Sequence, residues 1–175
     1  MTTSPLDETE PDRRAFRLAP RGRAAVSDFT PEERLFRRCL VSDLDPADSE
    51  RLFPNSISFY PDWSVNRGDF SEPEDVLYPD YLGWGIAAFQ VKDIPSPMKT
   101  EGNIPYHWDA QHQPLDENYS HTEIWTYKGG THLANPKAET DPKPPDLPKT
   151  VKKYFRTVLS ERARIICAPR TPPGL

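Results

Sequence analysis

The clearest pattern in the chain is a helical spacing of apolar residues near its C-terminus. Apolar side chains recur at intervals of three and four residues, at Val151, Tyr154, Phe155, Val158 and Leu159. Lysine, arginine and threonine fill the positions between them, so the spacing predicts an amphipathic helix with one apolar side. The apolar run at 163–168 then predicts a closing strand.

Apolar patterns of a shorter period predict strands elsewhere in the chain. Residues 83–92 are largely apolar on both faces, which is typical of a strand inside a sheet rather than at its edge. Residues 55–60 and 106–113 predict two further strands. Residues 121–133 form the clearest hairpin, because Gly129-Gly130 suits the two-residue turn that joins two extended arms.

Three segments carry residues that are typical of helix starts. Residues 30–33 have the form of a capping box, and the apolar residues after them favour a helix over 35–41, although the same run also fits a strand. Asp45-Pro46 predicts a second short helix that ends before Pro54. Residues 71–74 repeat the helix-start chemistry and predict a third.

Together these elements predict an α+β fold: a small, mainly antiparallel sheet, a packed C-terminal amphipathic helix and long proline-rich loops. We expect one domain over residues 28–169. Residues 1–27 lack periodic apolar positions and predict a disordered leader, and residues 170–175 predict a flexible C-terminus. Residues 135–148 are rich in proline and predict an extended spacer within the domain.

Composition limits the classes of function. The chain has 175 residues, 21 of them proline, and a formal net charge of -5. The negative charge argues against nucleic acid as a partner. No apolar run reaches the roughly 20 residues of a membrane helix, and no secretory signal is present, so we expect a cytoplasmic protein with no membrane partner. Two cysteines are too few for a disulfide framework.

All four histidines lie between residues 107 and 132. If Gly129-Gly130 is the turn, strand alternation places His132 opposite Tyr127. It also places four residues of the first arm on one face: His121, Glu123, Trp125 and Tyr127. Imidazole and carboxylate groups serve acid–base catalysis and bind metal ions. The register separates His121 from His132 by roughly 20 Å, so these two cannot share one metal ion.

His121 and Glu123 are therefore candidate catalytic residues, completed by His107 or Asp109 from a neighbouring strand. They would serve a metal-assisted or acid–base hydrolase. The sequence does not identify a cofactor, and a divalent metal ion is the cofactor that these candidate residues could bind. The simpler interpretation, which we favour, is a solvent-facing strand end with aromatic packing. Zinc deaminases share the His-x-Glu motif, but the Pro-Cys-x-x-Cys motif that they also require is absent from this sequence, which excludes that class.

A further alternative is an NAD-using transferase of the arginine–serine–glutamate type. An arginine would bind phosphate, a hydroxyl would orient a ribose and a glutamate would polarise its 2′-OH. Residues of these types are Arg37, Arg38 or Arg67, with Ser56 or Ser64, and Glu123. Their spacing does not constrain the arrangement, so this hypothesis is the weaker one.

The leading hypothesis is a small interaction or accessory module that acts within a larger complex, with a protein partner. Tyrosine, tryptophan and arginine side chains commonly anchor interfaces. The candidate binding residues are Trp125, Tyr127, His132, Arg67 and Trp63. A glycine-rich phosphate loop and a G-x-S-x-G elbow are absent from the sequence, and whether the protein is an enzyme stays open.

Overall fold

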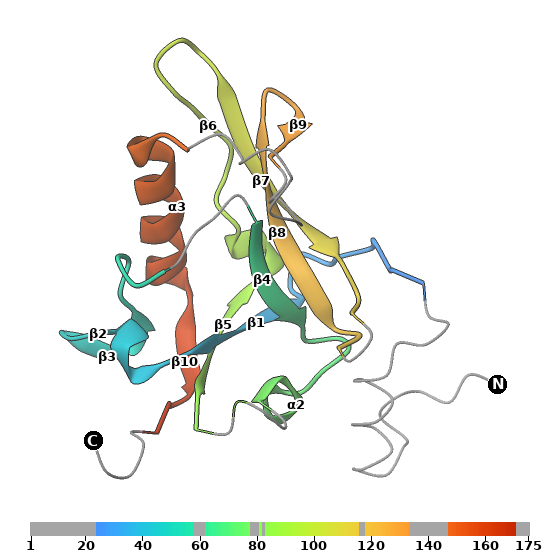
Figure 1. The fold of residues 1–175 in the computed structure, drawn as a ribbon, viewed down its shortest axis with the longest axis vertical. Helices are drawn as coiled ribbons and strands as arrows, with labels where there is room; N and C mark the ends of the chain where they lie inside the picture. The colour runs from blue at the N-terminus through green and yellow to red at the C-terminus, as the bar shows by residue number, and fades with distance from the viewer. Residues whose placement is uncertain are drawn as a thin grey trace, which may run out of the picture.

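The structure is a computed structural model that describes residues 24–57, 62–77, 81, 83–115, 118–133 and 147–170. These residues form a curled antiparallel sheet with two α-helices, an α+β arrangement at the coarse level (Figure 1). The predicted spacer, apart from residues 147–148, and the predicted C-terminus, apart from residue 170, lie outside the described residues. So does most of the predicted leader, although residues 24–27 are described.

The main sheet has eight strands, in the order β10-β5-β1-β4-β8-β7-β6, with β9 also paired to β8. The strands are β1 (Arg34–Cys39), β4 (Asp62–Arg67), β5 (Gly85–Gln90), β6 (Met98–Lys99), β7 (Pro105–His112), β8 (His121–Lys128), β9 (Thr131–His132) and β10 (Arg164–Cys167). A separate two-stranded sheet pairs β2 (Leu44–Asp45) with β3 (Asp48–Leu52). The helices are α2 (Pro73–Leu77) and α3 (Lys149–Arg162), and short 3-10 turns are η2 (Val41–Asp43) and η3 (Val91–Asp93).

The larger core lies between α3 and one face of the sheet (Figure 1). Val151, Phe155 and Leu159 of α3 are fully buried there, as the apolar period requires. The Phe155 ring packs at 5.9 Å from Trp63 and 5.5 Å from Trp108. A smaller cluster on the opposite face joins Val76 of α2 to Phe36 and Ile86. Both faces of β1 and β5 are therefore covered, which is why these strands carry apolar residues at successive positions.

The favoured helix at 35–41 is wrong, and the strand that fits the same residues is correct. β1 pairs with β5 along its whole length and with β4 at two positions. The segment before it forms a turn in which Glu33 N–H donates to Thr30 O at 3.1 Å. The Glu33 carboxylate binds Arg67 instead of capping a helix. Tertiary pairing on both edges overrides the local helix preference.

The short helix predicted after Asp45 is also wrong, because this segment forms the β2–β3 hairpin. Asp45 Oδ1 accepts from Ala47 N–H at 2.9 Å, and Asp48 Oδ1 accepts from Glu50 N–H at 3.0 Å. Such bonds from aspartate to nearby backbone favour turns over helices. Of the strand predicted at 55–60, residues 55–57 are not in a strand, and the rest lie outside the described residues. The strand of this region, β4, begins only at Asp62.

The other strand predictions are confirmed. β5 lies inside the sheet between β10 and β1, and β7 and β10 occupy the predicted segments. The helix predicted after Ser71 is α2. In the β8–β9 hairpin, Gly129 and Gly130 have φ angles of 57° and 84°, and Tyr127 pairs with His132. The register on which the candidate face depends is therefore the predicted one.

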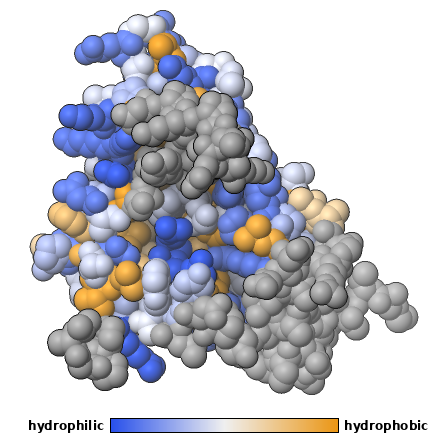
Figure 2. All heavy atoms as spheres, viewed as in Figure 1, coloured by the Kyte–Doolittle hydropathy of each residue, from blue (hydrophilic) through white to orange (hydrophobic). Residues whose placement is uncertain are grey.

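The described surface carries scattered apolar residues. On the side shown in Figure 2, hydrophobic residues form small groups between hydrophilic ones. Apart from the adjacent pair Leu40 and Val41, the exposed large apolar side chains of the described residues come from separate segments: Ile104, Leu115 and Ile166. Single exposed apolar residues of this kind are ordinary on protein surfaces. Within the described part of the chain, no helix is both long enough and apolar enough to cross a bilayer.

Candidate functional site

The predicted histidine–aromatic face lies on the side of the sheet that points away from α3. Along β8, Thr122, Ile124 and Thr126 are buried on the α3 side. The residues between them are half-buried on the other side: His121, Glu123, Trp125 and Tyr127. The pairing of β7 with β8 sets His107 beside Tyr127, Asp109 beside Trp125 and Gln111 beside Glu123. We refer to this surface of β7, β8 and β9 as the outer face.

Four rings on the outer face form two stacked pairs that contact each other. We call these rings the outer ring cluster: His107, Trp125, Tyr127 and His132. His107 lies on Tyr127 with ring centroids 4.6 Å apart and planes within 4°. His132 lies on Trp125 at 3.8 Å and 9°. Tyr127 and His132 are 5.6 Å apart, so the two stacks join into one cluster. Three strands therefore hold these rings in place together.

The candidate catalytic residues occupy the predicted face but do not converge on one point. His107 is aligned with Tyr127, four residues along β8 from Glu123, which corresponds to roughly 13 Å. Asp109 is aligned with Trp125 and lies nearer to Glu123. Asp109 is therefore the nearer partner for a His121/Glu123 pair, whereas His107 belongs to the ring cluster.

Hydrogen bonds within the sheet involve each member of this set other than His107. His121 Nδ1 lies 2.7 Å from the Gln113 carbonyl oxygen, which makes Nδ1 the donor of this bond. Glu123 Oε2 accepts from Trp125 Nε1 at 2.9 Å. Asp109 Oδ2 accepts from the Gln111 amide at 3.0 Å. These bonds orient the polar groups around the ring cluster.

Metal ligands are not brought together in the described residues. Within that part of the chain, no group of three histidine, cysteine, aspartate or glutamate side chains could hold a metal ion. A metal-assisted reaction on the outer face would therefore need a ligand from residues outside that part. The acid–base alternative with His121 and Glu123 stays a prediction.

Arg67, a predicted binding residue, is instead an internal residue with 1% of its surface exposed. Its guanidinium donates to both carboxylate oxygens of Glu33 at 2.7 and 2.8 Å. It also donates to the carbonyl oxygens of Val26 at 2.7 Å and Asp28 at 3.1 Å. These bonds occupy the guanidinium and attach the segment before β1 to the end of β4.

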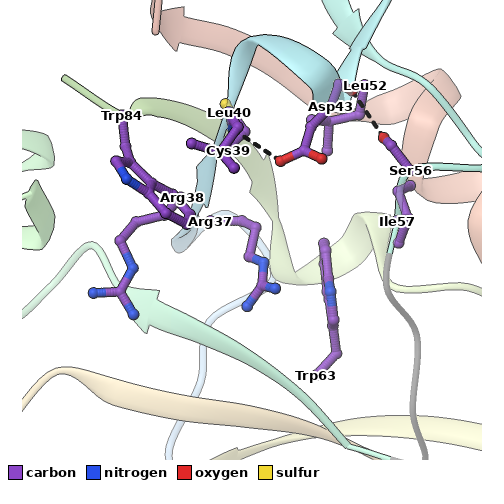
Figure 3. Close-up of a pocket in the computed structure, with 10 residues that line it drawn as sticks. All are labelled: Arg37, Arg38, Cys39, Leu40, Asp43, Leu52, Ser56, Ile57, Trp63 and Trp84. Carbon is purple, nitrogen blue, oxygen red and sulfur yellow. Dashed lines mark hydrogen bonds between the residues drawn. The ribbon is translucent and has the colours of Figure 1, made fainter. Parts of the chain in front are cut away.

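Trp63, another predicted binding residue, is a core residue with 3% of its surface exposed. Its indole stacks on Phe89 at 5.8 Å and meets Phe155 edge-on at 5.9 Å. Trp63 also borders a cavity of roughly 200 Å³ between β1 and β4, which we call the β1–β4 cleft. Its lining includes Arg37, Arg38, Asp43, Ser56, Trp63 and Trp84 (Figure 3).

The arginine–serine–glutamate set is divided between two places. Arg37, Arg38 and Ser56 line the β1–β4 cleft. Ser64 pairs with Glu123 in the register of β4 and β8, and the Glu123 carboxylate is bonded to Trp125 on the outer face. Sequence reasoning named several lining residues but missed Asp43 and Trp84, because the cleft depends on where two distant strands stop pairing.

Comparisons were made with protein-family models, with curated proteins and with solved structures, and none of the three finds a match for this chain.

Proposed function

We propose that the protein is a small interaction module that binds a protein partner, within a larger complex, through the outer face. The observation that carries this proposal is the paired stacking of the outer ring cluster, in which His107 lies on Tyr127 and His132 on Trp125. Aromatic rings offer a large contact area with few rotatable bonds. Because stacking already fixes these rings, a partner would immobilise little additional side-chain freedom.

The surroundings of the rings also favour binding over catalysis. Small-molecule sites are concave, whereas the outer face is the side of a sheet and the described cavity lies elsewhere, between β1 and β4. Polar groups at its margin, such as Glu123 and Asp109, already accept bonds from Trp125 and Gln111. A central group of rings with polar residues around it is the usual composition of a protein interface.

Isolation of the partner and a paired set of variants test the proposal. The tagged full-length chain is cross-linked and purified from its own cells, and the partner is identified and then produced separately. Calorimetry with the two purified proteins should show that the Trp125→Ala/Tyr127→Ala variant binds at least about tenfold more weakly, as loss of interface anchors does. Hydrogen exchange should slow in β7, β8 and β9 when the partner binds.

Ile166→Ala is the matched control, because Ile166 is an exposed apolar residue of β10, at the opposite end of the strand order. This variant should keep the wild-type affinity. Equal affinities for the wild type and the double variant, with both folded, would contradict the proposal. So would protection from exchange that is confined to β10 and β5.

A further inference from the structure

The β1–β4 cleft exists because two neighbouring strands in the middle of the sheet pair over only a short length. β1 and β4 pair at Leu35↔Arg67 and Phe36↔Asn66. Each strand pairs along its length with its other neighbour, β1 with β5 and β4 with β8. The end of β1 and the start of β4 therefore separate. Side chains that a continuous sheet would cover are exposed to the space between them.

Arg37 projects into this space without an acidic partner. Its Nη1 donates to the Ser64 carbonyl oxygen at 2.7 Å, and its guanidinium lies 5.1 Å from the Trp63 ring. Burial and the neighbouring charge of Arg38 lower the pKa of Arg37, and the charge of the Asp43 carboxylate partly opposes that shift. An arginine side chain remains charged at neutral pH. Among the described residues, no carboxylate forms an ion pair with Arg37.

The contrast with Arg67 shows what a structural arginine looks like in this protein. Arg67 is buried and receives a bidentate carboxylate from Glu33. Arg37 is half-buried one strand position beyond the last β1–β4 pair, and its side chain has only a carbonyl oxygen as a hydrogen-bond acceptor. A guanidinium that retains unused donors beside a cavity is suited to bind an anion from outside.

Arg38 adds a second positive charge to the same cavity. Its guanidinium lies 3.6 Å from the centroid of the Tyr81 ring, and Tyr81 in turn meets Trp84 edge-on at 5.4 Å. In Figure 3 both arginine side chains extend away from the carboxylate of Asp43. That carboxylate accepts from Leu40 N–H at 2.8 Å. The lining of the cleft therefore combines two cations and one carboxylate with aromatic rings.

Trp63 contributes a buried indole to the lining of the cleft. The residue is 3% exposed, and its Nε1 has no hydrogen-bond partner within the described residues. Figure 3 shows its indole extending into the cleft. Trp108 Nε1, which does not line the cleft, is likewise buried and unpaired, so an unpaired indole N–H does not by itself mark a ligand site. Because its Nε1 is shielded from solvent, Trp63 gives the cleft an aromatic wall, and the two arginines supply the unused hydrogen-bond donors.

We infer that the β1–β4 cleft binds a phosphate-bearing small molecule, with Arg37 and Arg38 as the residues that contact the phosphate. A phosphate monoester carries about −1.5 to −2 charges at pH 7, which matches two guanidinium groups better than a carboxylate does. Drug-sized ligands occupy roughly 300–1,000 Å³, so the smaller cleft would hold the phosphate and its nearest atoms. The rest of the molecule would lie against Trp84.

Calorimetric titration of the full-length protein tests this inference with three probes: inorganic pyrophosphate, ADP and adenosine. Pyrophosphate and ADP should bind saturably at one site, and adenosine should bind far more weakly because it lacks the phosphate. Arg38→Gln should weaken ADP binding at least about tenfold, which is the effect of losing a charge-assisted bond. Within the described residues the Arg38 side chain makes no hydrogen bond, and it contacts the Tyr81 ring, so this variant should stay folded with a melting temperature close to that of the wild type.

Arg34→Gln is the matched control, because Arg34 is an exposed arginine of the same strand and does not line the cleft. Its ADP affinity should equal that of the wild type. Three results would overturn the inference: no saturable binding of pyrophosphate or ADP at millimolar concentrations, adenosine binding as tightly as ADP, or equal weakening by Arg34→Gln and Arg38→Gln. The site is separate from the outer face, so these results do not depend on the protein partner.

Discussion

Arg67 and Glu33 form a bidentate ion pair that is almost completely shielded from water, with exposed side-chain fractions of 2% and 0%. The pair joins the residue just before β1 to the last residue of β4. It therefore lies at the paired end of these strands, opposite the end where the β1–β4 cleft opens. Phe29 and Phe70 lie 4.0 and 4.6 Å from the guanidinium and complete its enclosure.

Glu33→Gln should strongly destabilise the protein. Removing one charge of a buried pair leaves the other uncompensated, and such changes cost about 3–5 kcal/mol. The free energy of unfolding in urea measures the loss. Glu32→Gln is the control, because Glu32 is exposed and should change stability by less than about 0.5 kcal/mol. Equal urea midpoints for the two variants would show that the ion pair contributes nothing.

Gly130→Ala should destabilise the β8–β9 hairpin through the backbone alone. Gly130 has a φ of 84°, and a Cβ added there would meet no atom within 4 Å. Strain in this left-handed region costs about 1–2 kcal/mol for an alanine. Gly130→Asn should cost less, because asparagine tolerates such angles better. If alanine and asparagine unfold at the same urea concentration as glycine, the turn is not under this constraint.

The hairpin and its outer face could be predicted because every signal for them is local. The diglycine turn and the alternation of His121, Glu123, Trp125 and Tyr127 lie within a few residues of one another. In the neighbouring strand β7, the same period of two separates His112, which is buried on the core side, from His107 on the outer face. Turn chemistry and a period of two determine a register without reference to distant residues.

β1 and the β1–β4 cleft could not be predicted in this way. The residues after Thr30 satisfy the rules for a helix start, and only the pairing of β1 with β5, some fifty residues later, selects a strand. The cleft depends on where the pairing of β1 with β4 ends, just after Phe36. No residue near Arg37 in the sequence indicates that separation, so the sequence does not predict that Arg37 and Arg38 line one cavity.

Divalent metal ions should leave the melting temperature unchanged, and so should EDTA. A metal that binds the folded state raises its stability by mass action, and the described residues provide no three-ligand group to bind one. Thermal denaturation with Zn²⁺, Mn²⁺ or Mg²⁺ measures the effect. A metal-dependent increase that His121→Ala abolishes would contradict this expectation and support the metal-assisted hydrolase.

Cys39 should resist alkylation in the folded protein. Burial raises the pKa of its thiol to about 12, so almost none of the reactive thiolate is present at neutral pH. Cys167 is half-buried, and iodoacetamide should modify it first. Mass spectrometry of the native and urea-unfolded protein measures both sites, and unfolding should make them equally reactive. Modification of Cys39 at the rate of Cys167 in the native protein would be the contrary result.

His112 should make the stability of the protein depend on pH. It is 4% exposed and stacks on Phe70 at 5.3 Å. Its Nδ1 accepts from Val26 N–H at 2.9 Å, and its Nε2 bonds to the Tyr119 carbonyl oxygen. This pairing requires the neutral ring, because a protonated Nδ1 has no lone pair for Val26. Burial lowers the pKa of His112, and the bond to Tyr119 partly opposes that shift.

The direction of the effect follows from proton binding. Below the ordinary histidine pKa of about 6.5, the unfolded chain takes up a proton that folded His112 resists, so stability decreases as the pH falls. The decrease continues until the pH passes the lowered pKa of the folded state, with a slope of at most about 1.4 kcal/mol per pH unit. Above the ordinary pKa this residue contributes no slope. Urea unfolding between about pH 7 and pH 5 measures how the free energy of unfolding changes with pH.

His112→Gln should flatten this dependence, because glutamine is neutral throughout the range yet keeps a donor and an acceptor for Tyr119 and Val26. His107→Gln is the control, since it leaves His112 and its partners intact and should keep the wild-type slope. Identical slopes for His112→Gln and the wild type would assign the pH dependence to other groups. If His112→Gln lowers the free energy of unfolding already at neutral pH, that loss reflects packing, because protonation of His112 plays no part there.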